Sequence, residues 1–161
     1  MAIRNILTRE DPALYKPSRL VTNFDKRLHI LLDDLADTLR EAQGAGLAAP
    51  QVGVLRRVCI VELDDDDGLV ELVNPEIVSA EGEKEGREGC LSIPGVAGIV
   101  TRPARVTIRA RDRRGNEFVT TAEGLRARAC CHEIDHLDGK LYTEKVTRYL
   151  SEEEMAEAEE E

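Results

Sequence analysis

The sequence predicts an α+β fold, a single domain in which antiparallel or mixed β-sheets surround a central helix. The chain has 161 residues, which is the usual length of one domain. Residues 25–43 repeat apolar side chains at helical spacing, which predicts an amphipathic helix near the N-terminus. Residues 57–63 form a short run rich in Val and Ile, which is typical of a buried strand. We find no internal repeat and no second domain boundary in the sequence.

The composition is that of a globular protein with an acidic surface. Hydrophobic residues make up 42% of the chain and charged residues 34%, whereas aromatic residues make up only 3%. Aliphatic side chains must therefore fill the core. The formal net charge is −10, because 32 acidic residues outnumber 22 basic ones. This sign disfavours binding to a phosphate backbone, so we expect no direct nucleic-acid ligand.

The sequence also bears on the cellular compartment. No apolar run approaches the roughly 18 residues of a membrane-spanning helix, so we expect no membrane contact. The first five residues lack the apolar stretch of a signal peptide. The spacing of the four cysteines does not match a secreted disulfide framework: Cys59, Cys90, Cys130 and Cys131. We therefore expect a cytoplasmic protein.

The first predicted helix covers residues 25–43. Its apolar positions recur every three or four residues, as one buried helix face requires: Leu28, Leu31, Leu32, Leu35, Leu39 and Ala42. Gly44 follows at a position where helices commonly end in a glycine. Pro12 and Pro17 exclude a continuous helix earlier in the chain, so we expect residues 1–22 to be irregular.

Several short strands are expected after this helix. The small, glycine-punctuated segment 44–51 should be extended or looping, and the segment 57–63 should form a buried strand. An acidic turn at 64–68 follows it. Further strands are expected at residues 69–73, 76–80, 106–110 and 117–121, and a hairpin turn at 113–116 joins the last two.

A second helix is predicted over residues 123–138. Thr120 and Glu123 have the spacing of a capping box at its start, and Gly139 is a typical stop at its end. This is the central helix of the predicted fold.

Residues 132–136 of this helix read H-E-x-x-H. Because residues four apart lie on one helix face, the imidazoles of His132 and His136 can bind a single metal ion. Glu133 lies where its carboxylate can reach a water held by that metal and act as a general base. Chance rarely produces this pattern in a chain with three histidines.

A catalytic site of the zinc type needs a third protein ligand and an open fourth position. No histidine follows His136, although Asp138, Glu144 and the acidic tail offer carboxylates downstream. Upstream, Cys90 lies between a glycine and a turn-forming Ser-Ile-Pro, which would leave its thiol accessible. The residue pattern alone leaves both possibilities open.

Three separated motifs give the chain a resemblance to the peptide deformylases. G-x-G-x-A-A-x-Q stands at residues 44–51, E-G-C-L-S at residues 88–92 and H-E-x-D-H at residues 132–136, in the order of that family. The similarity extends from the N-terminal segment to about Val146. It implies a hydrolase that removes the N-formyl group from the N-terminal formyl-methionine of newly synthesised polypeptides and releases formate.

The resemblance implies a role for each motif residue. It implies one ferrous ion per chain, for which Zn²⁺, Ni²⁺ or Co²⁺ can substitute, held by Cys90, His132 and His136. Metal-bound hydroxide would attack the formyl carbon, with Glu133 as the base that shuttles protons. The side chain of Gln51 and the backbone N–H of Leu91 would stabilise the oxyanion.

The substrate site follows from the same resemblance. Gly46 would let the peptide backbone approach the segment around it. An apolar pocket for the methionine side chain is implied, and its candidate lining residues, which could otherwise pack in the core, are Ala45, Ile93, Leu125 and Ala129. Arg102 would either pair with the substrate backbone or carry a surface charge. Asp135 and Glu88 are candidates to accept hydrogen bonds from the ligating histidines.

The C-terminal tail departs from the family. We expect residues 1–150 to form the catalytic domain and residues 151–161 an acidic tail, where Ser151 starts a capping pattern for a short or frayed helix. Family members often carry a basic C-terminal extension thought to help ribosome docking. Ribosomal RNA would repel an acidic tail, so any association with the ribosome would not use this segment.

Two other functions fit part of the sequence. A small zinc metalloprotease would use only H-E-x-x-H and a downstream carboxylate, which leaves Cys90 and Gln51 without a purpose. A non-catalytic module that captures peptide N-termini would not need Cys90, Gln51 and Glu133 together.

Overall fold

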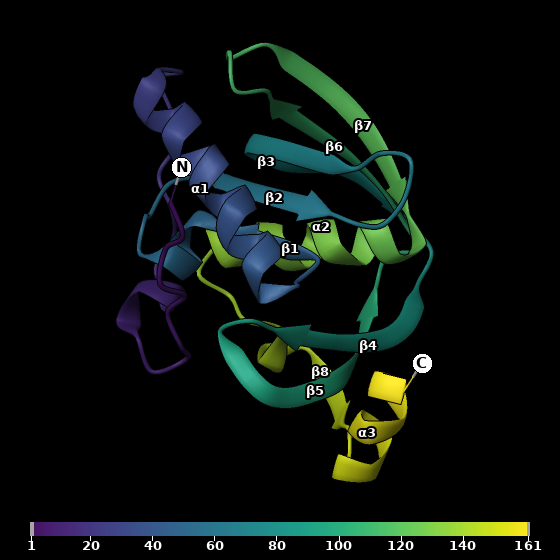
Figure 1. Ribbon diagram of the computed structural model, residues 1–161. Helices are drawn as coiled ribbons and strands as arrows, with labels where there is room; N and C mark the ends of the chain where they lie inside the picture. The colour runs from purple at the N-terminus through teal and green to yellow at the C-terminus, as the bar shows by residue number, and fades with distance from the viewer. Residues whose placement is uncertain (1, 161) are drawn as a thin grey trace.

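The computed structural model describes residues 2–160 and places a helix between two β-sheets (Figure 1). The α-helices are α1 (Lys26–Ala42), α2 (Gly124–Leu137) and α3 (Glu152–Glu160). Short 3-10 helices are η1 (Pro12–Tyr15), η2 (Ala49–Val52) and η3 (Tyr142–Glu144). The predicted α+β class, the amphipathic N-terminal helix and the central helix are confirmed.

Both sheets are antiparallel. The first has the strand order β1-β2-β3-β6-β7, with β1 (Gly46–Ala48), β2 (Val58–Glu62), β3 (Leu69–Glu81), β6 (Arg105–Arg111) and β7 (Glu117–Glu123). The second has the order β4-β5-β8, with β4 (Lys84–Cys90), β5 (Ile93–Arg102) and β8 (Val146–Tyr149). The predicted hairpin between β6 and β7 is confirmed.

Strand β2 is buried on both faces, which explains its run of Val and Ile. Cys59 and Val61 pack in the same apolar cluster as α2, whereas Val58 and Ile60 pack in the cluster that contains α1. Successive side chains of a strand point to opposite faces. Its first four residues are therefore buried apolar side chains, and Glu62, at the end of the strand, is partly exposed.

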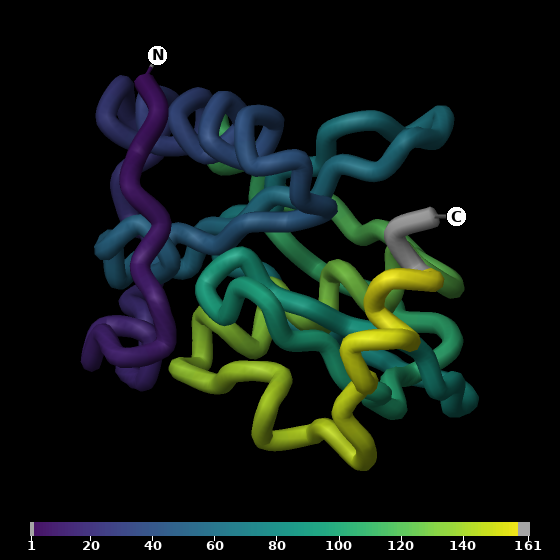
Figure 2. Tube along the Cα trace, turned by 60° about the horizontal axis from the view of Figure 1, so that its bottom comes forward, coloured from purple at the N-terminus to yellow at the C-terminus, as the bar shows by residue number. Residues whose placement is uncertain are grey.

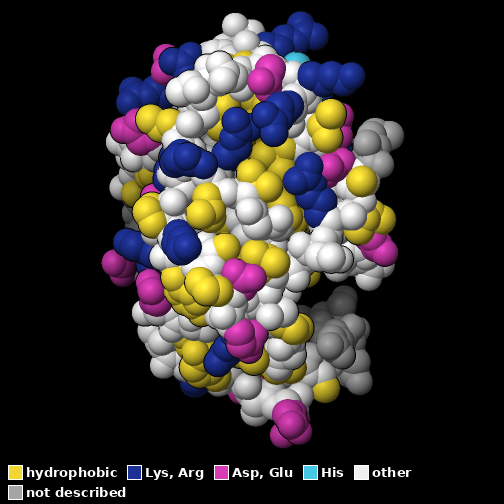
Figure 3. Space-filling model, turned by 90° about the vertical axis from the view of Figure 1, so that its left-hand side faces the viewer, with side chains coloured by type: hydrophobic (Ala, Val, Ile, Leu, Met, Phe, Trp, Pro, Cys, Tyr) yellow, Lys and Arg dark blue, Asp and Glu magenta, His cyan; other side chains and the backbone are white. Residues whose placement is uncertain are grey.

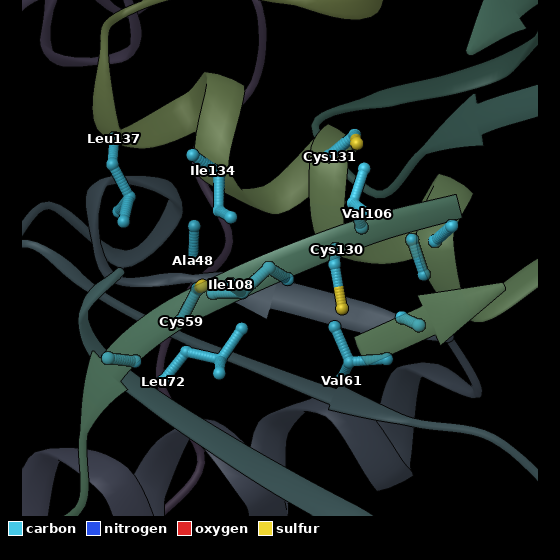
Figure 4. Packing of buried hydrophobic residues seen from close by; sticks show 14 residues of the cluster. Ala48, Cys59, Val61, Leu72, Val106, Ile108, Cys130, Cys131, Ile134 and Leu137 are labelled. Atoms are coloured by element: carbon cyan, nitrogen blue, oxygen red, sulfur yellow. The ribbon is translucent and has the colours of Figure 1, made fainter. Parts of the chain in front are cut away.

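Helix α2 is buried because it packs against both sheets. Cys130, Ile134 and Leu137 join residues of the first sheet in one apolar cluster, which includes Ala48, Leu72 and Ile108 (Figure 4). On its other side α2 contacts β5 of the second sheet. A separate cluster fills the core of that region: Leu14, Ile93, Val100, Leu141 and Tyr142. The polar side chains of α2 are therefore held inside the molecule.

The N-terminal segment ties these layers together. It runs along one side of the molecule and is purple in Figure 2. Its backbone N–H groups donate to the carbonyl oxygens of Gln51 at 2.7 Å, Ser92 at 3.0 Å and Leu137 at 2.8 Å. These three carbonyls belong to η2, to the turn between β4 and β5, and to the last turn of α2. One segment thus fixes three parts of the fold.

Two helix boundaries differ from expectation. Gln43, rather than Gly44, adopts the left-handed conformation that ends α1, with a φ of 57°. Thr120 does not cap α2, because it lies within β7, and Glu123 at the N-cap accepts no side-chain capping bond. Pairing with β6 gives this segment a row of backbone hydrogen bonds, whereas a cap would satisfy one N–H.

The strands also differ in part. Segments 69–73 and 76–80 form one strand, β3, which is irregular at Asn74, where φ is 51°. The side chain of Asn74 bonds the backbone N–H and carbonyl of Val21, which stabilises this bend. Strands β4, β5 and β8 are not predicted from the sequence. Glycines and charged residues interrupt β4 and β5, so neither alternation nor an apolar run marks them.

The C-terminal helix α3 begins with reciprocal capping bonds. The N–H of Glu154 donates to Oγ of Ser151 at 3.1 Å, and the N–H of Ser151 donates to the carboxylate of Glu154 at 3.1 Å. The carboxylate also pairs with Arg148 at 2.9 Å. The acidic start of this helix suits the positive end of its dipole.

Figure 3 shows one side of the molecule, on which basic, acidic and hydrophobic side chains are interspersed. Within the described residues, no helix has both the length and the apolar character needed to cross a membrane.

We expect Gly139→Ala to destabilise the fold more than Gly68→Ala. Both glycines have a positive φ, 75° and 58°, which alanine adopts at a cost of about 1–2 kcal/mol. A Cβ at Gly139 would also lie 2.7 Å from the backbone of Tyr15, whereas nothing lies within 4 Å at Gly68. Chemical denaturation should show a loss of roughly 3 kcal/mol or more for Gly139→Ala. Equal losses would contradict tight packing of the N-terminal segment on the end of α2.

Candidate metal centre and active site

Three potential metal ligands meet where β4 ends beside α2. The ligand atoms of Cys90, His132 and His136 all lie within 4.8 Å of one another. Cys90 is the last residue of β4, and its Sγ lies 3.4 Å from Nε2 of His136. The two histidine rings lie on one face of α2, with centroids 5.0 Å apart. The downstream carboxylates of Asp138 and Glu144 lie outside this group.

The charges around this group suit a divalent metal. A thiolate and two imidazoles form a donor set that zinc and iron accept. Burial alone would lower the pKa of His132. The charge of Glu133 and the hydrogen bonds with Cys90 and Glu88 outweigh burial and raise this pKa to about 10. The surroundings of His132 therefore favour a bound positive charge.

His136 lies in a different environment on the same helix. Burial, together with the charge of His132, lowers the pKa of His136 well below its ordinary value. Its imidazole is therefore neutral, which is the form that binds a metal. Among the described residues, its buried Nδ1 has no hydrogen-bond partner, and the same is true of Oε1 of Glu133. The surroundings of His132 favour a positive charge, which a metal ion can supply in place of a proton, whereas His136 is already in its neutral, metal-binding form.

Glu88 fixes the orientation of His132. Its Oε1 accepts a hydrogen bond from Nδ1 of His132 at 2.8 Å, so Nε2 is the ring nitrogen left for a metal. Burial would raise the pKa of Glu88, but hydrogen bonds from Arg102 and His132 outweigh it and lower the pKa to about 2. An ionised carboxylate in this position sets the tautomer and ring orientation of a metal-binding histidine. Glu88 thus has the supporting contact expected from the sequence.

Arg102 lies beneath this site rather than at its surface. Its side chain is 3% exposed, donates to both oxygens of Glu88 at 2.8 Å and donates to Asp135 at 2.6 Å. It does not line the cavity beside the ligands. This geometry fits neither a surface charge nor a contact with the substrate backbone, so Arg102 serves to hold Glu88. Asp135 accepts hydrogen bonds from Arg102 and Lys145. The expected hydrogen bond from a ligating histidine to Asp135 is not among these contacts.

Glu133 is buried against β1. It is 5% exposed, and burial raises its pKa to about 7. A Cβ on Gly46 would lie 2.6 Å from Oε2 of Glu133. Gly46 therefore admits this carboxylate, which is a reason for glycine other than the substrate approach expected from the sequence. Because no described residue bonds Oε1, the carboxylate can exchange a proton there.

Gln51 is fixed with its NH₂ group toward the ligands. The N–H of Ala48 donates to Oε1 of Gln51 at 2.9 Å, which orients the amide. Nε2 then donates to Oγ of Ser92 at 3.1 Å and to Sγ of Cys90 at 3.6 Å. Leu91, which follows Cys90, also lines the cavity. The NH₂ group of Gln51 thus points toward the metal ligands, where a hydrogen-bond donor to the oxyanion is expected.

A cavity of about 320 Å³ opens beside these residues. Its walls come from the residues at β1, from β4 and from the start of α2. The predicted site residues that line it are Ala45, Gly46, Gln51, Cys90, Leu91, Leu125, Ala129, His132 and Glu133. Ile93 does not line it, because this residue is 2% exposed and packs in the cluster with Val100 and Tyr142. The predicted pocket role of Ile93 is wrong.

Arg128 and Tyr142 belong to the site but are not predicted from the sequence. Arg128 lines the cavity and donates to Glu88 at 2.7 Å. The ring of Tyr142 stacks on that of His132, with centroids 5.7 Å apart. The available signal for Arg128 is its position four residues before His132, on the same helix face. Tyr142 gives no such signal, because the chain turns between it and the helix.

Sequence comparisons match this chain along nearly its whole length. A family model described as polypeptide deformylase matches residues 3–152. The peptide deformylase of Caldicellulosiruptor bescii is 57% identical over 155 residues, which cover 96% of this chain and 92% of that protein. Peptide deformylase 1 of Bacillus subtilis is 50% identical over 159 residues, which cover 99% of this chain and 99% of that protein.

Solved structures agree with these relatives. A peptide deformylase from Legionella pneumophila superimposes with a TM-score of 0.86 at 44% identity, covering 98% of this chain and 92% of that one. A class I type b peptide deformylase from Acinetobacter baumannii with Met-Ala-Ser bound gives a TM-score of 0.85 at 31% identity, covering 89% and 98%. This chain therefore belongs to the polypeptide deformylase family.

Proposed function

We propose that this chain removes the N-formyl group from the formyl-methionine of newly synthesised polypeptides and releases formate. The observation that carries this proposal is that the ligand atoms of Cys90, His132 and His136 lie close together beside a cavity. Cys90, His132, Glu133 and Gln51 line that cavity. The Acinetobacter relative supports it, because the bound Met-Ala-Ser begins with methionine.

The family is metal-dependent, and this chain offers one thiolate and two imidazoles for the metal. A divalent ion bound there supplies a Lewis acid that lowers the pKa of water toward neutrality. We propose one ferrous ion per chain, held by Cys90, His132 and His136. The donor set also suits Zn²⁺, Ni²⁺ and Co²⁺, which can substitute for iron.

Glu133 has the position and the burial of a proton carrier. Its carboxylate accepts a proton from the water that adds to the formyl carbon, and it later gives a proton to the leaving nitrogen. The carbon–nitrogen bond then breaks, and formate and a free amino terminus are released. A pKa raised to about 7 by burial suits both steps near neutral pH.

Two hydrogen-bond donors are placed to stabilise the oxyanion that forms on the formyl oxygen. Nε2 of Gln51 is held toward the ligands by the bond that Ala48 donates to Oε1. The backbone N–H of Leu91 is the second proposed donor. Because both groups are fixed before the substrate arrives, they need little reorganisation as charge develops.

The cavity suits a peptide that begins with an apolar side chain. Its walls include β4 and the segment at β1, which is the edge strand of its sheet, so an extended substrate can lie beside Gly46. Ala45, Leu125 and Ala129 provide apolar surface for the methionine side chain. Leu125 is 65% exposed, which is consistent with a residue at the mouth of the pocket.

The alternative functions are less well supported. A metalloprotease with a downstream carboxylate ligand does not fit the positions of Asp138 and Glu144, which lie outside the ligand group. A binding module needs no buried proton carrier beside metal ligands, whereas Glu133 is buried in that position.

We further propose that residues 1–150 form the catalytic domain and that the acidic tail adds nothing to the reaction. The tail helix α3 carries three glutamates in its first turn, so its charge opposes contact with ribosomal RNA. Any association with the ribosome would use another surface. A formylated nascent chain as substrate agrees with the expected cytoplasmic location.

Formate release from a formyl-Met dipeptide tests the proposal directly. Protein stripped of metal by a chelator should release no formate, and ferrous iron added without oxygen should restore the highest rate. Zinc, nickel and cobalt serve as comparison metals. Turnover by exhaustively stripped protein would contradict a metal-dependent reaction, and a higher rate with zinc than with iron would contradict the proposed metal.

Glu133→Gln should retain the fold and the bound metal, because this carboxylate is not a ligand and glutamine has the same shape. Formate release should fall by about 10²- to 10⁴-fold, which is the usual contribution of a general acid–base group. Glu123→Gln, at the exposed start of the same helix, is the matched control and should retain normal turnover. Near-normal activity of Glu133→Gln would remove Glu133 from the mechanism.

Deletion of residues 151–161 should leave turnover of a small formyl-peptide within about twofold of the intact chain, because no described residue of the tail belongs to the ligand group or the cavity. The measurement is kcat and KM for both proteins at matched metal content. A folded truncated protein without activity would show that the tail contributes to the site.

A further inference from the structure

We propose that Arg128 is a positioning residue of the metal site, because it holds Glu88 in the orientation that fixes His132. The inference rests on the metal site described under the proposed function. Arg128 is buried and takes no part in the reaction steps proposed above.

The guanidinium of Arg128 joins three parts of the molecule. Nη1 donates to Oε2 of Glu88 at 2.7 Å and to the carbonyl of Val100 in β5 at 2.9 Å. Nη2 donates to the carbonyl of Lys84 in β4 at 2.7 Å. A guanidinium is a rigid planar fork, so these bonds fix Glu88 relative to α2 and to both strands.

Arg128 completes the hydrogen bonding of Glu88. Oε1 accepts from His132 and Arg102, and Oε2 accepts from Arg102 and Arg128, all between 2.7 and 2.8 Å. A carboxylate has about four lone-pair sites, so all of them are used. Without Arg128, one site on Oε2 loses its donor, and Arg102 alone is left to hold Glu88 toward His132.

Arg128 also balances charge. Arg102 is shared between two carboxylates, those of Glu88 and Asp135, and its side chain is 3% exposed. Glu88 and Arg128 are 4% and 9% exposed, so the pair is shielded from water. Removing Arg128 leaves the buried charge of Glu88 only partly compensated, because Arg102 also pairs with Asp135. We therefore expect Glu88 to hold His132 less firmly.

The neighbouring strand is shaped for this side chain. A Cβ on Gly86 of β4 would lie 2.9 Å from the guanidinium of Arg128, so a larger residue there would displace the guanidinium. Arg126, two residues earlier on α2, provides a contrast. It is also mostly buried and pairs with Asp65 at 2.5 Å, but it makes no contact with Glu88.

Metal release tests the proposal without any substrate. Wild-type protein, Arg128→Met, Arg128→Gln and the matched control Arg126→Met are loaded with cobalt(II), whose visible absorption reports its ligands. Excess chelator is then added. We expect the Arg128 variants to release cobalt about 10- to 100-fold faster than wild type, as for other partners of metal ligands, and Arg126→Met to stay within threefold. Thermal unfolding of the metal-free proteins identifies the variants that fold, and either folded Arg128 variant suffices.

The same measurement in a Glu88→Gln background shows whether Arg128 acts through Glu88. If it does, adding Arg128→Met to Glu88→Gln accelerates release by less than about threefold, because the Arg128–Glu88 ion pair is already lost. Wild-type release rates in a folded Arg128 variant would overturn the proposal. A full additional acceleration in the Glu88→Gln background, or equal acceleration by Arg126→Met, would also overturn it. Since no formyl-peptide is used, these outcomes are separate from a failure of the deformylase assay.

Discussion

Burial of a charged helix between two sheets is the constraint on which this structure depends. Four charged or polar side chains of α2 are buried, namely Arg128, His132, Glu133 and His136. Burying such groups costs several kcal/mol each unless they are paired or neutralised. Glu88, which the second sheet supplies, pairs with Arg128 and His132. Burial instead favours the neutral forms of Glu133 and His136, because it raises the pKa of Glu133 and lowers that of His136. The first sheet supplies the apolar side chains that cover the opposite face of α2 (Figure 4).

This arrangement gives the two histidines of one motif different surroundings. His132 bonds a carboxylate that is itself saturated with donors, whereas Nδ1 of His136 has no partner among the described residues. Their pKa values accordingly move in opposite directions, although the residues are one helical turn apart. Local sequence places the ligands, but the surrounding sheets decide their charge and orientation.

The same distinction separates what the sequence predicts from what it does not. His132, Glu133 and His136 are predictable because four-residue spacing on a helix fixes their relation without knowledge of the fold. Cys90 is only one of several candidates by spacing, and the resemblance to a family singles it out. The burial of Arg102 cannot be predicted from the sequence, because its partners Glu88 and Asp135 lie 14 and 33 residues away.

Two glycines lie where the strands beside the cavity meet charged side chains of α2. Gly46 leaves room for the carboxylate of Glu133, and Gly86 leaves room for the guanidinium of Arg128. A β-branched residue at either position would favour strand formation but would collide with a charged side chain of α2. Glycine at these two positions therefore weakens the apolar pattern by which β1 and β4 could be recognised. Their weak sequence signal follows from the chemistry that they accommodate.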